Sequence, residues 1–142
     1  MAIQQLTVFL ENKRGKLAEV TRLLAKSGID LRALSIADTA EFGILRLIVS
    51  DTEKAKQILA ADGTLVQITD VVGVRLSDQP GELAEVLSAL DEKGINVEYL
   101  YAFLTRTENS AYVVLRVADN AAAEKTLQAA GFRLVVIQDI AP

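Results

Sequence analysis

Two short polar segments of this 142-residue sequence combine residue types that could hold a small charged ligand. The segments are Glu11-Asn12-Lys13-Arg14-Gly15-Lys16-Leu17 and Ser77-Asp78-Gln79-Pro80-Gly81-Glu82-Leu83. Each precedes a stretch with helical spacing, and a helix N-terminus presents unpaired N–H groups and partial positive charge, which suit a carboxylate. Glycine at positions 15 and 81 lets a ligand approach the backbone closely. The side-chain oxygens of Asn12 and Asp78 can accept hydrogen bonds from an ammonium group.

The composition excludes several kinds of catalytic site. The chain has no Cys and no His, which excludes disulfides, thiolate zinc sites, cysteine nucleophiles and His-assisted triads. We find no acidic cluster of the D-x-D-x-D-G type for Mg²⁺ or Ca²⁺. The net charge of −4 argues against a nucleic-acid groove. We therefore expect no metal, no cofactor, no nucleic-acid partner and no enzymatic activity.

The sequence also lacks the patterns of a membrane or secreted protein. No apolar run reaches about 18 residues, the length of a spanning helix. The N-terminus has no basic region followed by a long apolar one, as a signal peptide would. We expect a cytoplasmic protein with no membrane partner.

An internal repeat divides the chain. Residues 15–34 and 81–100 are identical at nine of twenty positions at an offset of 66. The offset becomes 68 further on, where Asp51 matches Asp119 and Gly63 matches Gly131. We place the two extra residues in a longer hairpin loop at Thr105–Ser110. The repeat predicts two domains, residues 1–69 and 70–142.

Each copy has the pattern strand, helix, strand, strand, helix, strand. In the first copy we expect strands at Gln5–Leu10, Asp30–Ala37, Gly43–Ser50 and Thr64–Thr69. In the second we expect strands at Val71–Ser77, Asn96–Leu104, Ala111–Ala118 and Phe132–Gln138. The predicted helices end at glycines, with Gly28 as a left-handed cap, and Ser50 or Asp51 caps the second helix.

Right-handed crossovers turn this order into an α+β fold of two tandem ferredoxin-like βαββαβ units. Each unit would have an antiparallel four-stranded sheet with two helices on one face. The residues expected to face the helices are Leu45, Leu47, Val49, Val113, Leu115 and Val117. Apolar residues also occupy the opposite face, namely Ile44, Ile48, Tyr112 and Val114. Because an apolar face needs cover, we expect a second chain to pack on it, as a homodimer or higher homo-oligomer.

The second polar segment carries a family resemblance. Its D-x-P-G-x-L pattern, followed by an amphipathic helix and Gly94-Ile95-Asn96-Val97, resembles the ACT domain, a family of regulatory modules that bind amino acids. The resemblance covers nearly the whole chain, once per copy, and is similar to stand-alone tandem ACT proteins. It implies an amino-acid ligand held where the turn meets the second strand of a neighbouring domain.

Carried over to this sequence, the resemblance implies a set of ligand-binding residues and no catalytic or metal-binding ones. In the turns they are Asn12, Arg14, Gly15, Lys16, Leu17, Asp78, Gln79, Pro80, Gly81, Glu82 and Leu83. In the strands they are Leu34, Ser35, Ile36, Leu100 and Tyr101.

Simpler structural roles compete with these assignments. Asn12 and Asp78 could cap the helices, and both glycines could serve only the tight turn. Pro80 suits a first helical turn, and Tyr99, Tyr101 and Phe103 share one face as interface core. The copies also differ: Arg14 departs from the family pattern where the second copy has Pro80, although it could provide a cation for a carboxylate. Tyr101 matches Ser35 in the first copy, so we expect unequal sites.

The leading hypothesis is a non-catalytic regulatory protein that binds an amino acid and thereby shifts its assembly or its affinity for a regulated enzyme partner. The alternative is a structural oligomerisation or interaction module without a small ligand. An enzyme on this fold is disfavoured, because the sequence lacks the phosphate-cradling loop of acylphosphatases and the C-x-x-C motif of metal chaperones.

Overall fold

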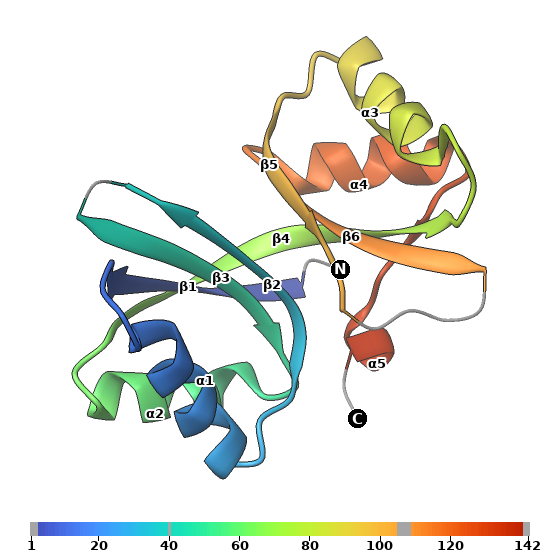
Figure 1. Ribbon diagram of the computed structural model, residues 1–142. Coiled ribbons are helices and arrows are strands. Elements are labelled where there is room, and N and C mark those ends of the chain that lie inside the picture. The colour runs from blue at the N-terminus through green and yellow to red at the C-terminus, as the bar shows by residue number, and fades with distance from the viewer. Residues whose placement is uncertain (1–2, 40, 105–108, 141–142) are drawn as a thin grey trace. The chain divides into compact units, whose positions relative to one another are not determined.

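The computed structural model describes residues 3–39, 41–104 and 109–140 (Figure 1). Residues 4–69 form one compact unit, and residues 70–140 together with Ile3 form the other. Most of the predicted hairpin loop, residues 105–108, lies outside the described residues. Within the described residues, no helix is long and apolar enough to cross a membrane.

Helices and strands follow the predicted order in both copies. Those of the first copy are β1 (Ile3–Glu11), α1 (Lys16–Lys26), β2 (Leu31–Asp38), β3 (Phe42–Val49) and α2 (Thr52–Ala61), and β4 (Leu65–Ser77) runs from the first copy into the second. Those of the second are α3 (Glu82–Glu92), β5 (Val97–Ala102), β6 (Ser110–Val117), α4 (Asn120–Ala129), β7 (Arg133–Leu134) and α5 (Ile137–Ile140).

The described strands pair in the order β2-β3-β1-β4-β6-β5, and β7 pairs with β4 beside this path. The predicted α+β class and antiparallel pairing are confirmed, because β1 pairs with β3, and β4 with β6, in antiparallel orientation. A separate four-stranded sheet for each copy stays a prediction. The strands expected at 64–69 and 71–77 are one 13-residue strand, β4. No glycine or proline lies between Ile68 and Val72 to break it.

The end of the chain differs from the prediction. Instead of a strand over Phe132–Gln138, the structure has the two-residue strand β7 and then α5. Asp139 explains the change, because its carboxylate Oδ2 accepts a hydrogen bond from the Val136 backbone N–H at 2.8 Å. The Asp139 N–H in turn donates to the Val136 carbonyl at 2.9 Å. Such local side-chain bonds compete with a strand ladder.

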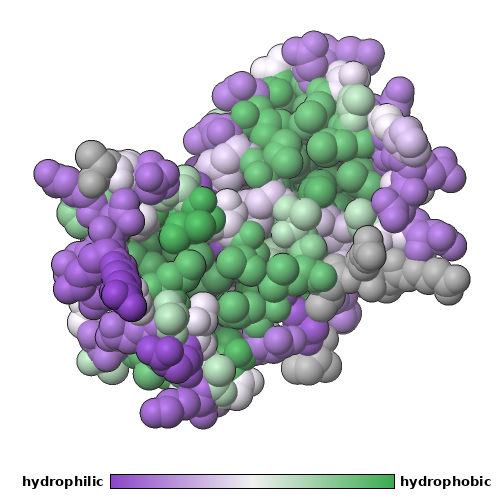
Figure 2. Space-filling view, in the orientation of Figure 1, coloured by the Kyte–Doolittle hydropathy of each residue, from purple (hydrophilic) through white to green (hydrophobic). Residues whose placement is uncertain are grey.

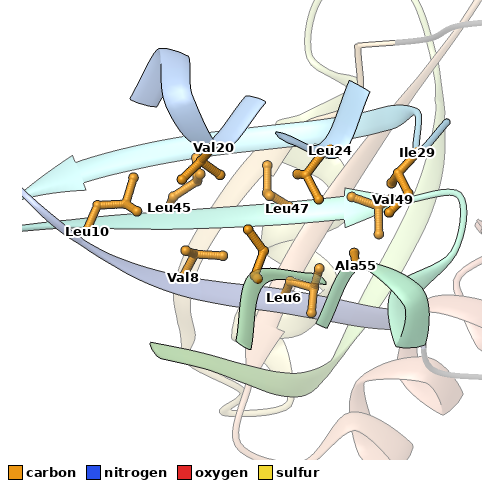
Figure 3. Packing of buried hydrophobic residues seen from close by; sticks show 11 residues of the cluster. Leu6, Val8, Leu10, Val20, Leu24, Ile29, Leu45, Leu47, Val49 and Ala55 are labelled. Carbon is orange, nitrogen blue, oxygen red and sulfur yellow. The ribbon is translucent and has the colours of Figure 1, made fainter. Parts of the chain in front are cut away.

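Each unit has an apolar core between its helices and one face of its strands. In the first, Val20 and Leu24 of α1 point toward the side chains of β1 and β3 (Figure 3). The second core uses the equivalent Val86 and Leu90 of α3. The six strand residues predicted to face the helices belong to these cores: Leu45, Leu47, Val49, Val113, Leu115 and Val117. The period-2 pattern therefore identified the inner face correctly.

The opposite face of the strands is less open than the sequence suggested. Gln5, Ile48 and Val114 are fully buried within the single chain, and the Gln5 side-chain amide donates to Thr7 Oγ1 at 3.0 Å. Large apolar side chains are instead exposed elsewhere, and apolar residues reach the surface in both units (Figure 2). These exposed residues are Leu17, Ile36, Phe42, Leu65, Leu100, Leu104 and Ile137. Cover by a second chain stays a prediction.

Candidate ligand-binding turns

The two predicted turns have the same backbone conformation. Gly15 and Gly81 immediately precede α1 and α3, with φ of 87° and 88°. This left-handed region carries a steric penalty for residues with a Cβ, which explains the glycine at both positions. A Cβ placed on either glycine would meet no atom within 4 Å. The space above each glycine is therefore open to a ligand.

Backbone hydrogen bonds repeat from one turn to the other. The Asn12 N–H donates to the Glu41 carbonyl at 3.2 Å, and its counterpart Asp78 donates to the Asn109 carbonyl at 3.0 Å. The first helical bonds, to the carbonyls of Gly15 and Gly81, are both 3.0 Å long. The two turns therefore differ in their side chains and not in their backbone.

The helices that follow these turns have no side-chain cap. Neither α1 nor α3 has a capping hydrogen bond, whereas Asp51 and Asp119 accept bonds from the Lys54 and Ala122 N–H groups of α2 and α4 at 3.1 and 3.0 Å. The alternative assignment of Asn12 and Asp78 as helix caps is therefore wrong. A helix without a cap leaves first-turn N–H groups available to another acceptor.

Opposite charge surrounds the two turns. Residues 11–16 hold Lys13, Arg14 and Lys16 against Glu11, for a net charge of 3 − 1 = +2. Residues 77–82 hold Asp78 and Glu82 and no cation, for a net charge of −2. In the first turn, Lys13 Nζ lies 3.6 Å from Glu11 Oε2 and Lys16 Nζ lies 3.8 Å from Glu19 Oε2. Among the described residues Arg14 has no such partner, so its charge is free to meet a carboxylate.

The predicted strand residues lie on two faces. Leu34 pairs with Leu47 and packs against the first core, and Ile36 pairs with Leu45 on that same face. Ser35 pairs with Arg46 on the opposite face. One continuous site within a unit therefore cannot use all three residues.

The second copy shows the same alternation. Leu100 pairs with the core residue Leu115, while Tyr101 pairs with Val114 on the opposite face. Tyr101 is only 7% exposed, and its ring stacks on that of Tyr99 with centroids 6.4 Å apart. Tyr101 is thus a buried packing residue that stacks on the half-buried Tyr99, and its assignment to the core of an interface stays a prediction.

A cavity beside each turn was missed by the sequence analysis. The first, about 290 Å³, is lined by the end of β1, the first turns of α1, Phe42 and residues 62–65. The second, about 260 Å³, is lined by the end of β4, Glu82, residues 109–110 and residues 131–133. The repeat offsets of 66 and 68 relate the two linings. The repeat matches Gly63 with Gly131, and these glycines lie in the two linings. This match was the signal in the sequence that could have indicated the paired cavities.

The repeated strand and helix order and the matching glycine turns define a tandem pair of α+β domains. The sequence profile described as "ACT domain pair" matches residues 1–139, and the chain belongs to this family.

Solved structures agree with this assignment. A crystal structure of a protein from Bacteroides thetaiotaomicron is 44% identical, with a TM-score of 0.91, and the match covers 99% of this chain and 96% of that one. The ligand-free regulatory subunit of aspartate kinase from Thermus thermophilus is similar in fold, with 18% identity, a TM-score of 0.66 and coverage of 90% and 91%. The comparison with curated proteins gives no match.

Proposed function

We propose that this chain is a non-catalytic regulatory domain pair that binds an amino acid at its strand-to-helix turns, residues 11–17 and 77–83. The observation that carries the proposal is the pair of uncapped helix N-termini, each beside a glycine with open space above it. The two domains would be the repeats 1–69 and 70–142.

The chemistry of the turns suits both ends of an amino acid. The ligand carboxylate would accept hydrogen bonds from the free N–H groups of the first helical turn, where the helix dipole favours negative charge. The ligand ammonium group would donate to the exposed side-chain oxygen of Asn12 or Asp78, neither of which caps a helix. The exposed Ile36 and Leu100 favour a ligand with an apolar or small side chain.

The two turns would bind unequally. The first turn, with a net charge of +2 and a free Arg14, favours the carboxylate end of a ligand. The second turn, with a net charge of −2, favours the ammonium end. Binding would shift a homo-oligomeric assembly or the affinity for a regulated enzyme. The Thermus relative, described as the regulatory subunit of a kinase, makes an enzyme partner the natural one to seek.

Calorimetry of the purified full chain against each proteinogenic amino acid tests the proposal. We expect saturable binding of one amino acid or a few related ones. Gly15→Ala or Gly81→Ala should weaken it at least tenfold at the turn that binds, because a methyl group would fill the space above the glycine.

Gly28→Ala is the matched control. Gly28 also has a positive φ, 73°, and a Cβ placed on it would meet no atom within 4 Å, but it ends α1 rather than beginning it. The variant should share the backbone strain and keep the affinity of the wild type. The proposal fails if no amino acid binds, or if Gly28→Ala weakens binding as much as the turn variants do.

A structural interaction module is the second candidate, favoured by exposed apolar side chains. Ile36 and Phe42 are each 49% exposed and Leu65 is 64% exposed. This candidate predicts a stable oligomer by light scattering that is insensitive to every amino acid. Replacing Leu65 by Ser would dissociate it.

A further inference from the structure

Two arginines face each other across neighbouring strands in the second unit. Arg75 of β4 is directly paired with Arg133 of β7, and both line the 260 Å³ cavity beside the second turn. Like charges at directly opposed positions of an antiparallel pair repel each other and destabilise the pairing. Their placement in one cavity therefore calls for a neutralising partner.

The described carboxylates neutralise this pair only in part. Asp139 Oδ1 lies 3.6 Å from Arg133 Nη2, a long contact, while its other oxygen accepts from the Val136 N–H. Glu82 lines the cavity, and it forms no ion pair with a described residue. The partner of Arg75 among the described residues is a neutral hydroxyl, Ser110 Oγ, which accepts from Arg75 Nε at 3.0 Å. The N–H groups on the two terminal nitrogens of this half-buried guanidinium therefore remain available to a ligand.

Ser110 holds the Arg75 side chain in a defined position. It is 6% exposed, and its backbone is paired with Ser77 in the β4–β6 ladder. A guanidinium fixed through Nε presents its remaining N–H groups as a planar fork, which matches the geometry of a carboxylate or phosphate.

The equivalent cavity of the first unit provides an internal comparison. At the repeat offsets, Phe9 occupies the position of Arg75, Phe42 that of Ser110, and Leu65 that of Arg133. At these three positions the first copy thus has apolar side chains, and the second has two cations and a hydroxyl. The fold does not require arginine at these positions.

We propose that the cavity between Arg75 and Arg133 is a binding site for a small oxyanion, a carboxylate or a phosphate group. The anion accepts hydrogen bonds from the free nitrogens of Arg75 and from Arg133, and it relieves the repulsion between them. The site is specific to the second repeat. Its lining shares Ser77 and Glu82 with the second turn, but the proposed contacts use none of the helix N–H groups of the turns, so the site goes beyond the proposed function.

Calorimetry of the full chain with inorganic phosphate and with succinate, in a low-salt chloride buffer, tests this site. We expect saturable binding at one site per chain, which weakens on addition of about 0.5 M NaCl because salt screens the charges. Tighter binding of inorganic phosphate would indicate a phosphate group as the ligand, and tighter binding of succinate would indicate a carboxylate. Arg75→Gln should lower the affinity about tenfold or more, the usual effect of losing a charged hydrogen bond.

Two further variants make the test selective. Arg133→Gln, at a side chain that is 62% exposed, should also weaken binding without disturbing the fold. Arg22→Gln removes the same charge from an exposed position on α1 and should leave the affinity unchanged. Circular dichroism melts would confirm that each variant folds.

The proposal is overturned if neither probe binds saturably, or if both arginine variants bind as tightly as Arg22→Gln. Titrating the same variants with the amino acid ligand separates this site from the turns. Loss of phosphate or succinate binding with amino acid binding intact supports two distinct sites. Oxyanion binding in a chain that binds no amino acid would refute the proposed function and leave this site standing.

Discussion

Replacement of Gly73 by alanine should destabilise the second unit through overpacking. Gly73 lies in β4 opposite Val114 and is buried. A Cβ at this position would lie 2.8 Å from Val135 Cβ and 3.2 Å from both Ile3 Cδ1 and Val135 Cγ2. Carbon atoms pack favourably at about 3.5–4.0 Å, so all three contacts would be repulsive.

The neighbours of Gly73 differ in how easily they can yield. Ile3 Cδ1 is the end of a flexible side chain and can rotate away. Val135 Cβ is attached directly to a backbone whose N–H donates to the Gly73 carbonyl at 2.8 Å, so moving it would strain that bond. Overpacking of this kind costs about 1–3 kcal/mol. Removing a glycine from the unfolded chain offsets about 0.4–1 kcal/mol, which leaves a net loss of about 1–2 kcal/mol.

Urea unfolding followed by circular dichroism measures this loss. With a slope of about 1–3 kcal/mol per molar urea, the midpoint should fall by roughly 0.5–1 M. Gly43→Ala is the matched control, because Gly43 is also a buried strand glycine. Its Cβ would meet Ile36 Cδ1 at 3.5 Å, an ordinary contact, so this variant should keep or slightly raise the midpoint. Equal midpoints for the two variants would refute the packing argument.

Two other pairs of substitutions test the repeat itself by urea unfolding. Asp51→Ala and Asp119→Ala each remove a helix cap and should each lower the free energy of unfolding by about 0.5–2 kcal/mol. Asn12→Ala and Asp78→Ala change residues that cap no helix and should lower it much less. Similar losses in all four variants would contradict the capping assignment. Leu24→Ala and Leu90→Ala, at equivalent and fully buried positions, should each cost about 2–5 kcal/mol, while the exposed Leu104→Ala control should change stability little.

Local patterns determined most of the fold from the sequence. The alternation of Leu45, Leu47 and Val49 identified the core face of β3 because side chains alternate strictly along a strand. Asp51 and Asp119 identified helix starts because a cap acts over three residues. The internal repeat then carried each assignment from one copy to the other.

The tertiary structure decided features that depend on residues far apart in the chain. The sequence placed Asn12 and Asp78 correctly in turns but left their role open; the geometry of the turn makes Gly15 and Gly81 the residues that precede the helices. The pairing of β2 with β3 also decided that Leu34, and not Ser35, faces the core.

Arg75 and Arg133 show most clearly the difference between what the sequence determined and what the tertiary structure decided. By itself the sequence determined a duplicated α+β unit with two glycine turns, because periodicity and capping act over a few neighbouring residues. Nothing local to Arg75 or Arg133 reveals that they are paired, since 58 positions separate them in the chain (133 − 75). Strand register across the sheet brings the two charges together. Burial of a whole face specifies such a register, and this depends on residues far apart in the chain.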